Sequence, residues 1–239
     1  GVGLEIQSDN NEIRGLAVNR FATGIEIDGG HDNLIAGNYV GTDPSGTIDS
    51  GNTSDGITIR NAATGNTVGG STAADRNIIS GNDNDGVWIT GSGTDTNTVQ
   101  GNWIGVGSDG SALGNSYHGV AVEFGAADNL VGGTGAGEGN RIENNAWDGI
   151  AFNGGNGTGN AALRNSISNN TGLGIDIDND GVTANDAGDG DTGDNDLLNY
   201  PVMTAANEVG GTVTAEFDLD VPAGWYRIEF FTNTAADPS

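Results

Sequence analysis

One short phrase recurs through most of the chain and constrains its fold more than any other feature. It consists of Asn, three residues, Gly, and then two apolar residues separated by one variable position, as in the stretch from Asn82 to Ile89. Five copies carry the Asn, and two earlier copies keep only the Gly and the apolar pair. The glycines lie at positions 3, 24, 56, 86, 119, 149 and 174, so the steps are 21, 32, 30, 33, 30 and 25 residues. A repeat of about 30 residues is typical of a solenoid, in which each repeat packs on its neighbours.

The residues after each glycine predict a β-strand, because apolar side chains at alternate positions share one face. The pairs expected to point inward are Leu4/Ile6, Ile25/Ile27, Ile57/Ile59, Val87/Ile89, Val120/Val122, Ile150/Phe152 and Ile175/Ile177. A second segment of the form Asn-x-Ile/Val follows in the same period, and a third short apolar segment follows that one, as in residues 76–82. Three short strands per repeat and about six coils, without helical periodicity, predict an all-β chain with a single-stranded parallel β-helix over residues 1–181.

The Asn of the repeated phrase is predicted to support the fold. Equivalent residues on stacked coils lie one strand spacing apart, about 4.8 Å. At that spacing Asn side chains hydrogen-bond to one another and to the backbone of the turn, which like-charged side chains cannot do. Asn and Gly also tolerate the left-handed backbone conformation, which we expect at these corners.

Three phrases resemble a known family: residues 77–82 (Asn-Ile-Ile-Ser-Gly-Asn), residues 101–105 (Gly-Asn-Trp-Ile-Gly) and residues 66–70 (Asn-Thr-Val-Gly-Gly). They look like the right-handed parallel β-helix repeat proteins of bacteria and archaea, which are secreted or cell-surface proteins with pectate-lyase-like coils. The resemblance covers about residues 3–205 and implies a right-handed helix, in keeping with the usual handedness of parallel crossovers. It also implies a secreted or cell-surface location. It is weak for function, because the family mixes polysaccharide-active enzymes with proteins of no assigned activity.

Charge restricts the partners of the chain. The 33 acidic residues face seven Arg and no Lys, for a net charge of −26. Nucleic acids and anionic membranes repel such a surface, so neither is expected as a partner. No apolar run approaches the length of a membrane span, so membrane insertion is not expected either. There is no Cys and hence no disulfide framework. Since residue 3 already belongs to a repeat, we expect the remainder of a longer parent chain.

The periodic pattern stops after Ile177, and a different region begins. Residues 182–210 are rich in Asp and Gly and are expected to form a connector. Residues 211–239 predict a β-hairpin whose first strand alternates from Val213 to Leu219, turns through residues 221–224 and returns through residues 225–231. This C-terminal hairpin either caps the open end of the solenoid or begins a truncated β-sandwich.

The Asp residues around this junction suggest a calcium site. Asp176, Asp178 and Asp180, followed by Gly181, match the first half of a calcium loop, with oxygen ligands at alternate positions before a sharp turn. Position 187, where such a loop places its bidentate Glu, is Ala. Closure of the site would fall to three later residues, Asp186, Asp189 and Asp191. The alternative is a solvated acidic linker.

A second group lies in the column directly before each glycine. Asp85, His118 and Asp148 occupy this position on successive coils, and side chains there lie about 5 Å apart. They could bind a metal or supply the acid and base of a glycoside-cleaving site. The simpler interpretation is that Asp before Gly is ordinary corner chemistry, and His118 is the residue that departs from it.

The variable position of each first strand is expected to point outward. There Trp88 is expected to be exposed, with Arg60 one coil before it and Glu123 one coil after it, and Glu26 and Asp28 lie further along the same face. An aromatic ring beside an Arg and carboxylates suits a sugar, which stacks on the ring and hydrogen-bonds through its hydroxyls.

Two functional hypotheses follow. The first is a non-catalytic, acidic extracellular module that acts as a surface, stalk or glycan-binding (adhesin-like) domain, with calcium as a stabilising ion. The second is a polysaccharide-active enzyme, a lyase, epimerase or glycoside hydrolase, whose catalytic candidates are Glu123, Arg60, Asp85, His118 and Asp148. The resemblance implies that lyases of this fold pair calcium with an Arg or Lys base. This chain lacks Lys, and no Arg has an evident Asp triad around it, which favours the first hypothesis.

Overall fold

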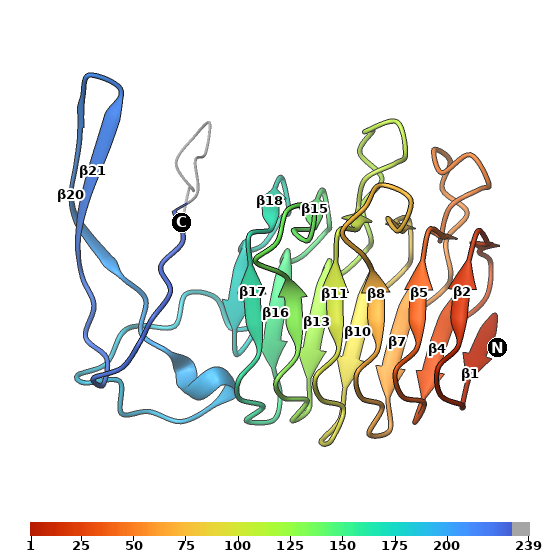
Figure 1. Cartoon of the computed structure of the whole chain (residues 1–239), viewed down its shortest axis with the longest axis horizontal. Coiled ribbons are helices and arrows are strands. Elements are labelled where there is room, and N and C mark those ends of the chain that lie inside the picture. The colour runs from red at the N-terminus through yellow and green to blue at the C-terminus, as the bar shows by residue number, and fades with distance from the viewer. Residues whose placement is uncertain (231–239) are drawn as a thin grey trace.

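The chain forms a parallel β-helix with three sheets, as its repeats predict (Figure 1). The computed structural model describes residues 1–230, so Phe231 of the expected hairpin lies outside the described residues. The first sheet contains β1 (Leu4–Ile6), β4 (Ile25–Asp28), β7 (Ile57–Arg60), β10 (Val87–Thr90), β13 (Val120–Glu123), β16 (Ile150–Asn153) and β19 (Ile175–Ile177). The second contains β2 (Glu12–Arg14), β5 (Leu34–Ala36), β8 (Thr67–Gly69), β11 (Thr98–Gln100), β14 (Leu130–Gly132) and β17 (Ala161–Leu163). The third contains β3 (Ala17–Val18), β6 (Tyr39–Val40), β9 (Ile78–Ile79), β12 (Trp103–Ile104), β15 (Arg141–Glu143) and β18 (Ser166–Ser168).

The core is a column of stacked apolar side chains. Each coil pairs in parallel register with the next, so that Ile57 lies beside Val87 and Val87 beside Val120. The inward-facing side chains of the central coils are fully or almost fully buried. At the last coil Ile175 is 38% exposed, because β19 pairs with β16 alone. The predicted inward pattern is therefore confirmed in the central coils and weakens at the open end.

Asn ladders run along three corners of the solenoid. In the predicted ladder, the Nδ2 of Asn52, Asn82, Asn115 and Asn145 each donates to the Oδ1 of the next Asn at 2.9 Å. A second ladder joins Asn11, Asn33, Asn66, Asn97, Asn129 and Asn160. The third joins Asn38, Asn77, Asn102, Asn140 and Asn165. Sequence reasoning missed this third ladder, although each of its Asn lies directly before or near the third strand of its coil.

The glycine of the repeated phrase is required for a different reason from the one expected. None of these seven glycines, nor the Asn of the phrase, has a left-handed backbone. A Cβ on Gly86 would instead lie 2.6 Å from the carbonyl oxygen of Gly119 and 2.9 Å from Nδ2 of Asn115. Such contacts are too close for any side chain, so only Gly lets the coils stack here. The expectation of left-handed corners at these positions was wrong.

The C-terminal hairpin pairs different segments from those expected. β20 (Val202–Val209) runs antiparallel to β21 (Thr212–Asp218), joined by Gly210 and Gly211 with positive φ. A two-residue Gly-Gly turn matches the twist of a hairpin, and this local signal prevails over the turn expected at residues 221–224. Residues 225–230 form no strand. The hairpin therefore begins inside the segment predicted as a connector.

The end of the solenoid is covered by a short 3-10 helix, η1 (Asp194–Leu197). The carboxylate of Asp194 accepts the backbone N–H groups of Gly155 and Gly157, and Asn195 Oδ1 accepts that of Asn160, which extends the second Asn ladder by one step. The hairpin stands apart from the coils (Figure 1), and most of its apolar side chains are exposed, including Val209 at 80%. Capping was one of the two roles expected for the hairpin, and η1 makes these hydrogen bonds to the last coils. In the described part of the chain, no helix has the length and apolar character that crossing a membrane requires.

Candidate functional site

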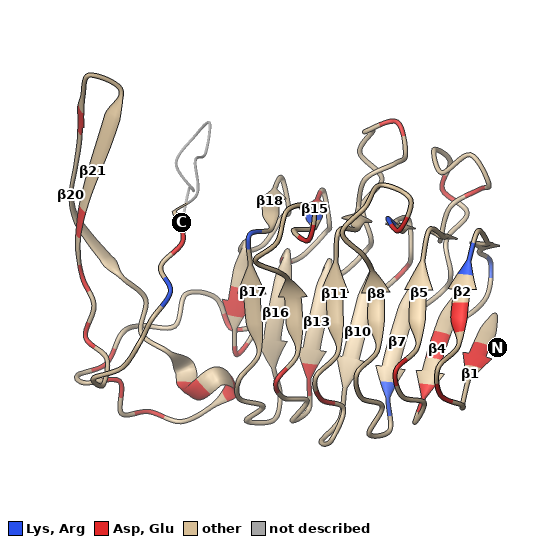
Figure 2. Cartoon of the chain, viewed as in Figure 1, with Lys and Arg blue, Asp and Glu red and all other residues tan. Residues whose placement is uncertain are grey.

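The outer face of the first sheet is more closed than its sequence suggests. Pairing places Thr58, Trp88, Ala121, Ala151 and Asp176 in one column. Of these only Trp88 is partly exposed, and the other four are each at most 3% exposed. Figure 2 shows that acidic residues are distributed along the solenoid and its corners, with few basic residues among them. Of these five residues, Trp88 is therefore the one that a ligand could contact.

Trp88 and Glu123 come together as predicted, but they bond to each other. The indole Nε1 of Trp88 donates to Glu123 Oε2 at 2.8 Å. The other carboxylate oxygen, Oε1, accepts from Asn153 Nδ2 at 2.9 Å. Both oxygens of Glu123 are thus engaged by neutral donors, and the Trp88 ring is half-buried. This arrangement orders the face and leaves no unengaged base.

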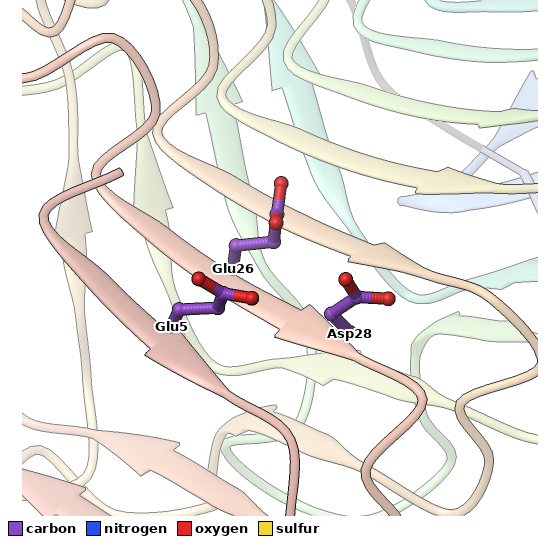
Figure 3. A group of neighbouring side chains, drawn as sticks. All are labelled: Glu5, Glu26 and Asp28. Atoms are coloured by element: carbon purple, nitrogen blue, oxygen red, sulfur yellow. The ribbon is translucent and has the colours of Figure 1, made fainter. Parts of the chain in front are cut away.

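Arg60 turns towards the preceding coil and away from this pair. Its Nη2 lies 2.9 Å from Glu26 Oε1 and 3.3 Å from Asp28 Oδ2. Oxygens of Glu5, Glu26 and Asp28 lie within 4.8 Å of one another (Figure 3). Burial raises the pKa of the Glu26 carboxyl, Arg60 opposes that effect, and Asp28 and Glu5 add to it. The five predicted sugar-binding residues therefore form two separate hydrogen-bonded groups.

The corner column before the glycines is buried. Asp55 and Asp85 are each 3% exposed, and each accepts a backbone N–H of the next coil, from Asp85 and His118 respectively. Burial raises the pKa of Asp85 to about 8, and the charge of Asp55 adds to this effect. A substrate cannot reach carboxylates held in this way, so the corner interpretation fits Asp55 and Asp85.

Asp148 makes the same corner contact, because its Oδ1 accepts the backbone N–H of Leu173, and His118 is the residue that departs from the column. His118 is fully buried, and its Nδ1 lies 3.3 Å from Asp148 Oδ2. Neither ring nitrogen of His118 has a hydrogen-bond partner among the described residues, and neither does Asp148 Oδ2. Asp176, on the last coil, also has a buried oxygen without a partner, and burial raises its pKa to about 6. Unsatisfied buried groups of this kind are rare in folded proteins.

The structure brings together half of the predicted calcium ligands. Oxygens of Asp186, Asp189 and Asp191 lie within 4.8 Å of one another. Asp186 also accepts the N–H of Gly190, and Asp189 that of Asn199. The predicted first half of the loop is not part of this group. Asp176 is buried on the sheet and accepts the N–H of Gly181, whereas Asp178 and Asp180 are exposed.

An open hollow on the third sheet was missed by the sequence analysis. Its volume is about 280 Å³, and its lining residues are Gly37, Tyr39, Ala73, Ala74, Arg76, Ile78, Trp103 and Ser108. Strand pairing places Tyr39, Ile78, Trp103 and Arg141 in one outward column. The loop between β8 and β9 contributes Ala73 and Ala74 to the lining, and the loop after β12 contributes Ser108. The signal in the sequence was the pair Tyr39 and Trp103, which occupy equivalent positions in the third strand of their coils.

Arg76 is the one charged residue that lines this hollow. Its guanidinium carbon lies 4.6 Å from the centre of the Trp103 ring, and that of Arg141 lies 5.2 Å from the same centre. Among residues 1–230 no hydrogen bond or ion pair satisfies Arg76, whose Nε is buried. The adjacent Asp75 is paired with Arg14, and Arg141, the other Arg beside Trp103, is paired with Glu143. The hollow thus carries a local positive charge on an acidic protein.

Comparison of the chain with protein-family models, with curated proteins and with solved structures found no match. The class of protein that the structure shows is the parallel β-helix with three strands per coil.

Proposed function

We propose that the chain is a non-catalytic, acidic β-helix module of a secreted or cell-surface protein, and that it binds a glycan. The resemblance to pectate-lyase-like repeat proteins supports the location and the general role as a surface or stalk domain. Calcium at Asp186, Asp189 and Asp191 would stabilise the end of the solenoid, because three carboxylates offer the oxygen ligands that Ca²⁺ prefers.

The unpaired Arg76 in its hollow carries the proposal. A guanidinium pairs bidentately with a planar carboxylate, and such charge-assisted bonds are stronger than neutral ones. With 33 acidic residues in the chain, an Arg that pairs with none of the described ones is available for an external anion. Trp103 and Tyr39 supply aromatic surface for a sugar ring. The ligand class is therefore a glycan that presents a carboxylate-bearing sugar residue.

The size of the hollow supports a short ligand. At about 280 Å³ it lies just below the range of pockets that enclose drug-sized molecules. It suits one sugar residue of a longer glycan, with the remainder of the glycan outside. A site of this kind gives modest affinity by itself, which a surface domain compensates for by presenting many copies.

The catalytic alternative has less support on the first sheet. Of its candidate residues, Glu123 has both oxygens bonded, Arg60 is paired with two carboxylates, and Asp85 is buried. General acid–base catalysis needs a group within hydrogen-bond reach of the substrate. These residues instead connect neighbouring coils, which is a structural role.

The test is binding of oligosaccharides that end in a uronic acid, compared with the neutral sugars of the same linkage, by isothermal titration calorimetry. We expect the acidic ligand to bind more tightly, and Arg76→Gln to weaken it by about 10- to 100-fold, the worth of a charged hydrogen-bonded pair. Arg20→Gln is the matched control, because Arg20 is exposed and its side chain donates only to Ser50 in the described part of the chain. Equal affinity for the acidic and neutral ligands would refute the proposal.

Turnover tests the alternative directly. We expect no unsaturated or reducing ends from a panel of uronate and neutral polysaccharides. Clear turnover that Glu123→Ala abolishes would establish the enzyme instead.

A further inference from the structure

His118, Asp148 and Asp176 lie on three successive coils at the C-terminal end of the solenoid. His118 precedes β13, Asp148 precedes β16, and Asp176 lies within β19. All three are at most 3% exposed. Together they contain four nitrogen or oxygen atoms that are buried without a hydrogen-bond partner among the described residues, namely both ring nitrogens of His118, Asp148 Oδ2 and Asp176 Oδ1. Because an unpaired buried polar atom costs free energy, we infer that these atoms bind a further group.

The geometry of the first pair indicates what that partner is. Nδ1 of His118 and Oδ2 of Asp148 are 3.3 Å apart, close enough for a hydrogen bond, yet the two groups are not aligned as donor and acceptor. Two ligands on a tetrahedral ion with bonds of about 2.0 Å are separated by about 3.3 Å. The pair therefore has the spacing of two ligands on one ion.

We propose that His118, Asp148 and Asp176 bind a divalent transition-metal ion of the Zn²⁺ class. Imidazole and carboxylate ligands suit Zn²⁺, whereas Ca²⁺ prefers an all-oxygen shell. Two carboxylates and one neutral imidazole balance the charge of the ion, and the net charge of −26 attracts cations in general. This site is distinct from the Asp186, Asp189 and Asp191 group and does not depend on glycan binding.

Asp176 must approach the pair when the ion binds. In the structure, the ligand atoms of His118, Asp148 and Asp176 do not all lie within 4.8 Å of one another. Asp176 belongs to the last coil, where β19 pairs on one side only and Ile175 is partly exposed, so a small shift there disturbs few contacts. The ion would then join three coils at the end where the solenoid is least supported.

The surroundings indicate a structural rather than a catalytic ion. The Tyr117 ring packs on His118 with centroids 4.1 Å apart, and Trp147 stacks on Tyr117 at 5.8 Å. The indole Nε1 of Trp147 donates to Asn179, just beyond β19. This aromatic cover closes the site to a substrate. With three protein ligands, water would fill the fourth position of a tetrahedral ion.

The experiment uses the full chain, freed of metal with a chelator and titrated with ZnCl₂, with CaCl₂ in parallel. We expect one equivalent of Zn²⁺ to bind and to raise the melting temperature by about 5–10 °C at a hundredfold excess over Kd. CoCl₂ should give the visible absorption of tetrahedral Co²⁺ with a nitrogen ligand. His118→Asn and Asp176→Asn should each weaken Zn²⁺ binding at least about tenfold, since each removes one ligand.

The control is Asp189→Asn, which alters the other acidic group and should bind Zn²⁺ like the parent. Circular dichroism of each metal-free variant shows whether it folds, and Asp176→Asn, which changes only the last coil, keeps the test valid if His118→Asn does not fold. The proposal is refuted if the parent chain binds no Zn²⁺. It is equally refuted if Asp189→Asn abolishes binding while Asp176→Asn leaves it unchanged.

Discussion

Replacement of Asn115 by Ala tests whether the Asn ladders hold the coils together. Its side chain donates to Asn145 Oδ1 at 2.9 Å and to the carbonyl oxygen of Ile79 at 3.1 Å. Its Oδ1 accepts the backbone N–H of Asn82 at 3.1 Å and the Asn82 side chain at 2.9 Å. The change removes four buried hydrogen bonds and leaves the Asn82 backbone N–H without a partner. At about 1 kcal/mol for each bond, the free energy of unfolding should fall by about 4 kcal/mol.

The loss corresponds to a fall in melting temperature of about 10 °C for a chain of this length. Asn170→Ala is the matched control, because Asn170 ends the same ladder and is only partly buried. It loses three hydrogen bonds that water can replace, so we expect a fall of about 4 °C. Thermal melts followed by circular dichroism give both values, and hydrogen exchange should show lost protection around residues 79–87 in Asn115→Ala alone. Equal destabilisation by the two variants would refute the reasoning.

Three further predictions follow from the packing. Arg60→Ala should lower the free energy of unfolding by about 2 kcal/mol, because it leaves the buried Glu26 carboxylate without its countercharge. Adding Glu26→Gln to this variant should restore most of the lost stability, as measured by guanidinium denaturation. Removal of residues 201–239 should change the melting temperature little, whereas removal from residue 194 onward, which deletes η1, should expose the last coil and lower it clearly. Calcium should raise the melting temperature by about 5 °C at a hundredfold excess over Kd, and Asp189→Asn should abolish that shift. An equal melting temperature with and without chelator would count against the calcium site.

The fold was predictable because the repeats specify it many times over. Each glycine lies just before a strand, and the alternation of apolar residues after it determines which face of the strand is buried. All seven copies therefore predict the same register. The first Asn ladder followed from the same stacking. The reason for the glycines was not predictable, since the close approach of Gly86 to the Gly119 carbonyl exists only once the coils stack.

The functional surface was less predictable, because side-chain direction and loop placement do not follow the repeat. Strand alternation placed Trp88, Arg60 and Glu123 on one face, but rotamers turned Trp88 towards Glu123 and Arg60 towards Glu26. The sequence also could not choose which segment pairs with residues 212–218, as two alternating segments flank it.

By itself, then, the sequence determined the stacked parallel coils, their apolar core and the Asn column, since these depend on local periodicity that each repeat restates. Tertiary structure alone decided which polar groups meet. It left Arg76 without a carboxylate in a hollow rimmed by separate loops, and it enclosed His118 with Asp148 beneath aromatic rings. Those outcomes depend on contacts between coils and loops that vary from repeat to repeat, and no local pattern encodes them.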